Sequence, residues 1–164
     1  MAVLNRASVK KVKQALKDAN LKVRFRELKS PASGVKTAAR ALKVEPGAVV
    51  QSNLYFIGEQ PVLVLVAGDH KCLAEALPRC LALDDAGEVR RASKYEDKKY
   101  TGYERGGIAP MMVDLPTAID VSLKRFETVY VPGGDPHAVF TSDCKTLNRL
   151  TGGIISYAIA APAD

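Results

Sequence analysis

Apolar side chains recur every three to four residues near the start of the chain, at Val9, Val12, Leu16 and Ala19. Lysines occupy the opposite face of this stretch, and Ser8 precedes it as a favoured N-cap residue. The pattern therefore predicts an amphipathic helix from Ser8 to about Ala19.

Alternating or continuous apolar runs predict the strands. Residues 22–28 alternate between apolar and basic side chains, which predicts a half-exposed strand with a basic outer face. Gly58-Glu59-Gln60-Pro61 predicts a hairpin between the next two strands. Further strands are expected at Val49–Ile57, Val62–Ala67, Thr117–Asp120, Thr128–Pro132, His137–Phe140 and Ile154–Ala160, with Gly133–Pro136 as a turn. The continuous apolar runs 61–67 and 154–161 are expected to be buried.

Capping residues and glycines predict the other helices. These are expected at Thr37–Lys43, from Asp69 to Leu81, at Ser93–Tyr100, over Val121–Phe126, and from Ser142 or Asp143 to Leu150, ended by Gly152. Helices and strands do not alternate as strict β-α-β units. The sequence therefore predicts an α+β fold, with a mixed, mostly antiparallel sheet or open barrel flanked by helices, in a single domain over residues 1–164.

The composition is that of an ordinary globular domain. The chain has 164 residues, of which 47% are hydrophobic and 26% charged, which argues against a disordered or low-complexity protein. We expect no membrane span, because no apolar run approaches about 20 residues, and no secretory signal, because no apolar segment follows the basic start. Three cysteines without a C-x-x-C spacing argue against disulfides or structural zinc and favour a cytoplasmic location.

Positive charge is concentrated at the start of the chain. Nine of the 24 Lys and Arg residues lie among the first 30 residues, with only two acids, in a chain of formal net charge +6. Such a patch attracts phosphate groups. A solvated helix face gives the same pattern and is the alternative.

Several ordered segments resemble a known family: Val62–Lys71, Thr101–Tyr103 with Gly106–Pro110, Ile119–Asp120 with Ser122–Leu123, Gly134–Phe140 and Leu147–Gly152. Their order and spacing are similar to those of the YbaK/ProX family, free-standing relatives of the editing domain inserted in bacterial prolyl-tRNA synthetases. The resemblance extends from about Ser8 to the end of the chain. It implies a compact mixed β-barrel with surrounding helices, and hydrolysis in trans of the ester joining a wrong amino acid to tRNA.

One position departs from this resemblance. The strand that carries a catalytically important lysine in the family has Gln51 at that place. Gln donates and accepts hydrogen bonds but has no charge. If the lysine anchors a phosphate or a developing oxyanion, Gln51 is a weaker, neutral substitute.

An aminoacyl ester is already activated, so the protein has to position water, stabilise the oxyanion and select the side chain. The backbone N–H groups of Gly106 and Gly107 are candidates for the oxyanion site, with a tight turn as the alternative. Asp120 is a candidate for binding the α-ammonium group, water or the ribose, with an N-cap before Val121 as the alternative. His137 is a candidate for orienting water or contacting the terminal adenosine, with an ordinary strand histidine as the alternative.

The substrate pocket is expected to be small and to suit Ala, Ser, Thr or Cys. Candidates for substrate binding are Tyr55 and Met111 in its walls, with Phe56 and Met112, and Pro110 as a brace for the glycine loop. Plain core packing is the alternative for each of the wall residues. Gln51 is expected to point into this pocket. The chemistry requires no metal and no organic cofactor.

The expected function is therefore trans-editing by an aminoacyl-tRNA deacylase. Its partner is the acceptor end of a tRNA carrying a small amino acid, and an aminoacyl-tRNA synthetase is a further candidate partner. Two alternatives stay open. The chain is a tRNA or aminoacyl-binding module that has lost hydrolysis through Gln51, or it is a scaffold or regulatory subunit attached to a synthetase.

The basic N-terminal region predicts a steep salt dependence of tRNA binding. Lys10, Lys13, Lys17, Arg24 and Arg26 are the candidate contacts to the acceptor-end backbone, and each neutralised phosphate releases counterions. The affinity for tRNA, measured at low and at moderate salt, should fall steeply between the two conditions. A flat response would contradict this assignment.

Overall fold

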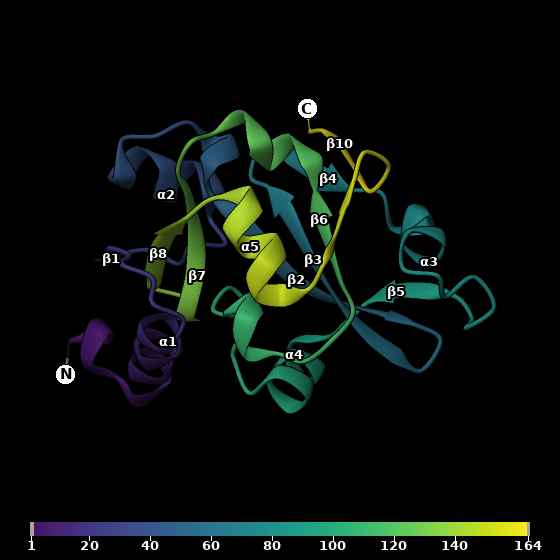
Figure 1. Cartoon of the computed structure of the whole chain (residues 1–164), viewed down its shortest axis with the longest axis horizontal. Helices are drawn as coiled ribbons and strands as arrows, with labels where there is room; N and C mark the ends of the chain where they lie inside the picture. Colours follow the sequence, from purple (N-terminus) through teal and green to yellow (C-terminus); the bar gives the residue numbers. More distant parts are fainter. Residues whose placement is uncertain (1, 164) are drawn as a thin grey trace.

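A computed structural model describes residues 2–163 (Figure 1). Its helices are α1 (Ala7–Asp18), α2 (Val35–Leu42), α3 (Leu77–Cys80), α4 (Lys94–Thr101) and α5 (Cys144–Thr151), with short 3-10 turns η1 (Val3–Asn5), η2 (Pro46–Ala48), η3 (Ala74–Ala76), η4 (Pro110–Met112) and η5 (Val121–Arg125). Its strands are β1 (Phe25–Glu27), β2 (Val50–Ile57), β3 (Gln60–Ala67), β4 (His70–Cys72), β5 (Val89–Arg91), β6 (Thr117–Asp120), β7 (Val129–Asp135), β8 (Ala138–Ser142), β9 (Ile154–Ser156) and β10 (Ala160–Pro162).

The strands form three sheets. The largest has the order β5-β2-β3-β6-β9, in which β2 is antiparallel to β3 and β5, while β6 is parallel to β3 and β9. A second sheet, β1-β8-β7, and a third, β10-β4, are antiparallel. This arrangement confirms the predicted α+β fold with mixed, mostly antiparallel sheets. The sheets do not close into the barrel that the resemblance implied.

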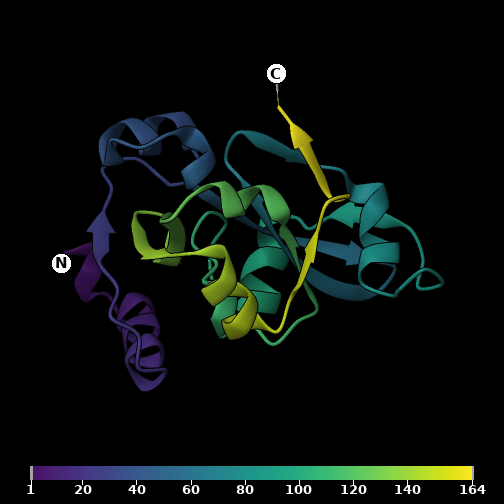
Figure 2. The same ribbon diagram turned by 45° about the horizontal axis from the view of Figure 1, so that its top comes forward.

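The core lies on both faces of β3. Leu63 and Leu65 face a cluster that includes Leu147 of α5, the helix in front of β2 and β3 in Figure 1. Val64 and its neighbours two residues away face a second cluster around Leu77 of α3. A strand covered on both faces is apolar throughout, which explains the continuous run that predicted it. The N-terminal elements α1, β1 and α2 lie together on one side of the molecule (Figure 2).

Strand β2 belongs to the largest sheet and lies next to the second sheet. It pairs with β3 along its whole length, but with β5 only from Tyr55 to Ile57. On the same edge, before β2 begins, Val49 forms a parallel bridge to Tyr130 of β7. Between these two contacts, at residues 51–53, β2 is paired with neither β5 nor β7.

The structure corrects three predicted elements. The helix expected from Asp69 is wrong: β4 pairs with β10 instead, and α3 starts only at Leu77, because Pro78 fits the first turn of a helix and not its interior. The closing strand is divided into β9 and β10. The predicted turn at Gly133 lies within β7, which continues to Asp135 with a shift in its pairing. Within residues 2–163, no helix is both long enough and apolar enough to cross a membrane.

Asp120 joins β3 to β6 at the end of the parallel pair. Its carboxylate accepts hydrogen bonds from the Ala67 N–H at 3.0 Å, the Ser122 N–H at 2.9 Å and the Ser122 hydroxyl at 2.7 Å. The Ser122 N–H bond is the N-cap of η5. Asp120 is 3% exposed, so loss of its carboxylate leaves the buried Ala67 N–H without a partner.

Replacement of this carboxylate should destabilise the fold strongly. We expect Asp120→Ala to lower the free energy of unfolding by about 2–4 kcal/mol, measured by urea denaturation. Asp143→Ala is the matched control, because Asp143 caps α5 through Thr146 without a bond to a distant strand, and it should cost about 1 kcal/mol. Equal costs for the two variants would show that the bond to Ala67 contributes nothing.

Candidate functional site

Two adjoining hollows form the candidate site, and the smaller one lies beside β2. The small pocket encloses about 230 Å³ and is lined by Ala32, Ser33, Val50, Gln51, Ser52, Asn53, Arg91, Arg105, Gly106 and Pro132. The large groove encloses about 750 Å³ and is lined by Arg6, Pro31, Ser33, Lys94, Tyr95, Lys98, Glu104, Arg105, Asp135, Pro136 and His137. They share Ser33 and Arg105, so the two hollows meet at these side chains.

Ser52 places a buried polar group, without a partner in the described part of the chain, at the small pocket. The Ala92 N–H donates to the Leu54 carbonyl, which therefore points away from β3. Since backbone direction repeats every two residues along a strand, the N–H and C=O of Ser52 also point away from β3. The Ser52 side chain is 3% exposed, and its hydroxyl has no hydrogen-bond partner among residues 2–163. Such an orphaned buried hydroxyl indicates a place for a ligand or water.

Gln51 is among the residues that line the small pocket, and its amide is engaged in hydrogen bonds. The Nε2 group donates to the carbonyl of Ala67 at 3.0 Å and to that of His70 at 3.1 Å. Both amide hydrogens are thereby used, and only Oε1 stays available to a ligand as an acceptor. Gln51 therefore braces the turn between β3 and β4 and brings no positive charge to the pocket.

Two arginines bring positive charge to the small pocket. Arg105 Nε donates to Asp97 Oδ2 at 2.7 Å, and its guanidinium also donates to the carbonyl of Ala92. Burial raises the pKa of Asp97, and the guanidinium of Arg105 opposes that rise. Arg91 donates to Asn53 Oδ1 at 2.8 Å, a neutral partner.

Of the two adjacent glycines near the pocket, Gly107 has a structural role and Gly106 is accessible to a ligand. The Gly107 N–H donates to the Glu104 carbonyl at 2.9 Å, so it is not available to a ligand. A Cβ at Gly107 would lie 2.7 Å from the Asp135 carbonyl carbon, which explains the glycine. Gly106 has a φ of +90°, and its N–H finds no acceptor within the described part of the chain. Gly106 is therefore the better candidate for a ligand contact.

The large groove combines basic and aromatic side chains. Lys94, Tyr95 and Lys98 line it from α4, and Tyr95 is 73% exposed. His137 lies there as well, with Nδ1 3.0 Å from the Leu28 carbonyl. A carbonyl only accepts, so Nδ1 carries the proton and Nε2 has the lone pair in the neutral ring. The groove thus presents the features that bind single-stranded nucleic acid, namely cations and an aromatic face.

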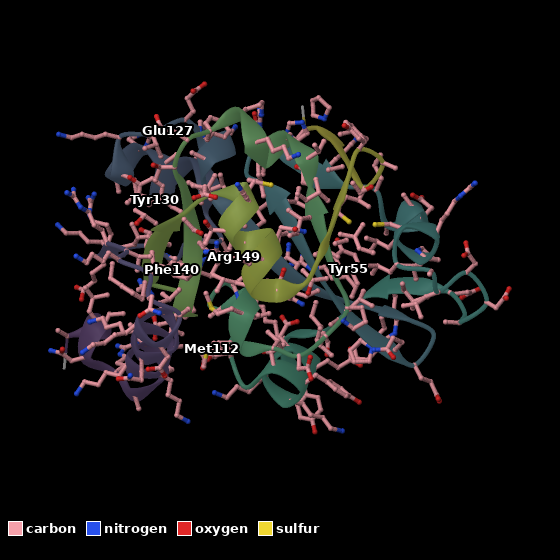
Figure 3. All side chains as sticks on the ribbon, viewed as in Figure 1. Tyr55, Met112, Glu127, Tyr130, Phe140 and Arg149 are labelled. Carbon is pink, nitrogen blue, oxygen red and sulfur yellow. The ribbon has the colours of Figure 1, made fainter. Side chains whose placement is uncertain are left out.

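Five predicted catalytic or substrate-binding residues line neither hollow, namely Gly107, Asp120, Tyr55, Pro110 and Met111. Asp120 is buried as described above. Tyr55 packs against the cluster around Leu77, and burial, with Cys72 close by, raises the pKa of its hydroxyl to about 12. Pro110 is buried and Met111 packs on the main core. Figure 3 shows Tyr55 well apart from Met112, the neighbour of Met111. The structure thus places Gln51, Gly106 and His137 at adjoining hollows, and the other five candidates do not line them.

The predicted basic contacts are spread over a separate surface. Lys13 donates to the Leu4 carbonyl at 2.9 Å and stands over the ring of Phe25. Arg26 lines a third hollow of about 520 Å³ together with Lys29 and Arg40. The others, Lys10, Lys17 and Arg24, are exposed, and none of them lines the small pocket or the large groove.

Sequence reasoning missed the other polar residues of the site. Ser33 lies outside the predicted helices and strands, and Ser52 lies within a predicted strand that gives no sign of its role. Arg91 and Arg105 carried no motif, and β5, which holds Arg91, is three residues long. Asn53 lies two residues after Gln51, so the alternation of side chains along a strand places both on the same face of β2.

A cluster of Ser122, His70 and Asp69 resembles a catalytic triad in composition only. His70 Nδ1 is 2.8 Å from Asp69 Oδ1 and 3.4 Å from the Ser122 hydroxyl, so one nitrogen serves both neighbours. A triad needs the two ring nitrogens for its two partners. Arg125 instead pairs with both oxygens of Asp69, at 2.9 and 2.7 Å. Hydrogen bonds from Arg125, followed by those from His70, hold the pKa of Asp69 well below its usual range.

The family model described as the aminoacyl-tRNA editing domain matches residues 29–150. The chain belongs to this family. The matched region includes the whole small pocket and most of the large groove. The geometry described above is therefore that of an editing domain related to the trans-editing partners of prolyl-tRNA synthetase.

Relatives of this editing domain include parts of larger enzymes. The proline–tRNA ligase of Lactobacillus helveticus is 34% identical over 103 residues, which are 62% of this chain and 18% of the ligase. The uncharacterized protein YwhH of Bacillus subtilis is 30% identical over 129 residues, covering 76% of this chain and 79% of YwhH. The chain thus spans less than a fifth of the ligase it matches.

A solved structure supports the fold of the editing domain. It is a crystal structure of a protein proposed as a trans-editing enzyme for prolyl-tRNA synthetase, 29% identical, with a TM-score of 0.81. The match covers 92% of this chain and 96% of that protein. The likeness therefore extends over nearly the whole chain, beyond the residues of the family match.

The Asp69–Arg125 pair should make stability depend on acid pH. The folded-state pKa of Asp69 is lowered, so its stabilisation is full above the unfolded pKa of about 4 and decreases as the pH falls below it. Because the Asp69 side chain is 39% exposed, we expect Asp69→Asn to cost only about 0.5–1 kcal/mol at pH 7. Urea denaturation at pH 7 and pH 3 should show a smaller cost at pH 3. Asp85→Asn, in an exposed loop, is the control, and a cost of Asp69→Asn that grows toward pH 3 would refute the pairing.

Proposed function

We propose that this editing domain is a deacylase that acts in trans on a tRNA carrying a small, wrong amino acid. The observation that carries the proposal is the small pocket opening into a larger basic groove, in a chain of the aminoacyl-tRNA editing family. The small pocket is below the range of about 300–1,000 Å³ typical of drug-sized ligands. Its volume suits a small aminoacyl group, and the groove suits nucleotides.

The two hollows divide the substrate at its ester bond. The aminoacyl group enters the small pocket, and the ester lies at the junction beside Ser33, Arg105 and Gly106. The terminal nucleotides lie in the large groove, where Lys94 and Lys98 face phosphates and Tyr95 stacks on a base. His137 contacts the terminal nucleotide. The exposed N-terminal lysines and arginines contact the backbone further along the acceptor stem.

Hydrolysis needs positioning more than a strong nucleophile. The oxygen of a water molecule bonds to the ester carbonyl carbon, and the bond between that carbon and the ribose oxygen breaks. The ribose oxygen takes up a proton, which leaves a free amino acid and an uncharged tRNA. The Gly106 N–H and the Arg105 guanidinium stabilise the oxyanion, while the Ser52 hydroxyl orients the water.

Selection among amino acids rests on pocket volume. A site that excludes larger side chains by size acts as a sieve, whereas binding alone separates substrates that differ by one methylene only about 10- to 200-fold. Ala, Ser, Thr and Cys are therefore the candidate substrates. A prolyl-tRNA synthetase is the candidate partner, since its relatives carry a matching segment within their own chains.

One observation favours a second function, that of a binding module. Gln51 is neutral and both hydrogens of its amide are engaged, so it cannot do what a lysine would do there. In that case the domain holds the tRNA end without cleaving the ester.

The test is a deacylation assay with tRNAs charged with Ala, Ser, Thr, Cys or a large amino acid. Wild-type protein should release the small amino acids. Ser52→Ala should lower the rate about 5- to 10-fold and raise the free energy of unfolding by about 1 kcal/mol, because it removes a buried hydroxyl that has no partner in the free protein. Loss of activity with a gain of stability is the combination that a packing defect does not produce.

Ser122→Ala is the matched control. The Ser122 hydroxyl is bonded to Asp120 and lies outside both hollows, so this variant should lower stability and leave the rate unchanged. If wild-type protein binds tRNA but releases no amino acid from any of the substrates, the deacylase proposal fails and the binding module stands. A gain of hydrolysis in Gln51→Lys would then support that reading further.

A further inference from the structure

The arginines at and near the small pocket differ in whether a carboxylate neutralises their charge. Three arginines lie on or near β5 and the glycine loop. Arg90 pairs with both oxygens of Glu96, at 2.7 and 2.8 Å, and Arg105 pairs with Asp97 at 2.7 Å. Arg91 forms no ion pair with any carboxylate of residues 2–163. Arg91 is thus the arginine of the pocket with an uncompensated charge.

Strand register brings Arg91 to the same face as Gln51. Arg91 is paired with Tyr55, and side chains paired across an antiparallel ladder share a face. Asn53 and Gln51, two and four residues away on β2, lie on that face too. The Arg91 guanidinium donates a hydrogen bond to Asn53 Oδ1 at 2.8 Å. Asn53 is two residues from Gln51, which corresponds to about 7 Å along the strand.

We propose that Arg91 binds a negatively charged oxygen of the ligand in the small pocket and supplies the positive charge that Gln51 lacks. The inference rests on the proposed function. Two observations carry it: Arg91 lines the pocket, and its single side-chain hydrogen-bond partner among residues 2–163 is the neutral amide of Asn53. A guanidinium held by a neutral amide is oriented but stays free to exchange that contact for an anion.

The anionic oxygen has two sources in an aminoacyl-tRNA. One is the phosphate of the terminal nucleotide, which is present before and after the reaction. The other is the oxyanion formed when water attacks the ester carbonyl. Binding of the phosphate contributes to affinity for uncharged RNA, whereas binding of the oxyanion contributes only to the rate.

The experiment compares Arg91→Ala, Arg91→Lys and Arg90→Ala. We expect Arg91→Ala to lower kcat/KM for deacylation about 10- to 100-fold, the range of a lost charge-assisted hydrogen bond. Arg91→Lys should retain part of the activity because it keeps the charge. Arg90→Ala removes the neighbouring charge outside the pocket and should leave kcat/KM unchanged. A thermal denaturation curve for each variant verifies that it is folded.

A second-site variant tests the link to Gln51 directly. Gln51→Lys places an ammonium group on the same face of β2, so in the Arg91→Ala background it should restore most of the lost activity. A role of Arg91 in packing alone predicts no such rescue. Activity that is lost in Arg91→Ala and is not restored by Gln51→Lys would assign Arg91 a role in packing and overturn the proposal.

Binding of an uncharged RNA hairpin that ends in CCA separates the two sources. If the oxygen belongs to a phosphate, Arg91→Ala weakens hairpin binding and reduces the slope of log affinity against log salt by about 0.7. If it belongs to the oxyanion, hairpin affinity is unchanged and kcat falls. An Arg91→Ala protein with wild-type hairpin affinity and wild-type kcat refutes the proposal.

Binding of the RNA hairpin also separates a failure of this inference from a failure of the proposed function. If wild-type protein hydrolyses no substrate, the deacylase proposal fails, and hairpin binding still decides the role of Arg91. Weaker hairpin binding by Arg91→Ala then supports an anion site in a binding module. Equal binding by the two proteins, without hydrolysis, overturns both proposals.

Discussion

The site depends on one constraint: β2 cannot pair with two diverging strands along the same edge. It is bridged to β7 just before its start and bonded to β5 at its end, and residues 51–53 are paired with neither strand. A strand edge that is not fully paired is normally covered by other groups. Here the small pocket occupies the gap. The architecture that joins the two sheets therefore also creates the polar hollow between them.

Some polar groups around this gap have several hydrogen-bond partners, and others have none within residues 2–163. Gln51 and Arg105 are held by several hydrogen bonds, whereas Ser52 and Gly106 have groups without partners in residues 2–163. Fully bonded side chains fix the shape of the walls, and unbonded groups are the ones that a substrate can engage without breaking an existing contact. The buried Ser52 hydroxyl, without a partner among the described residues, lowers the stability of the free protein, and it also gives the pocket a polar group that a ligand can engage.

Local signals in the sequence were enough for much of the fold. The continuous run of β3, the N-cap at Ser93 with Glu96, and Asp143 before α5 all act over a few residues, and the predicted elements follow them. Sequence reasoning failed where long-range pairing decides: β4 forms because β10 returns beside it, and β5 is too short to leave a pattern. The site was predicted in part for the same reason. Gln51 and Gly106 followed from the family pattern, whereas Arg91 depends on the register between two strands.

The backbone edge at Ser52 has a consequence for how the pocket walls can vary. Main-chain groups exist whatever residue occupies a position, so the part of the pocket they form is insensitive to substitution. Side chains in the walls, such as Asn53 and Arg91, project from a frame that does not depend on their identity. The side chains of the pocket walls can therefore change without a change in the backbone frame that carries them.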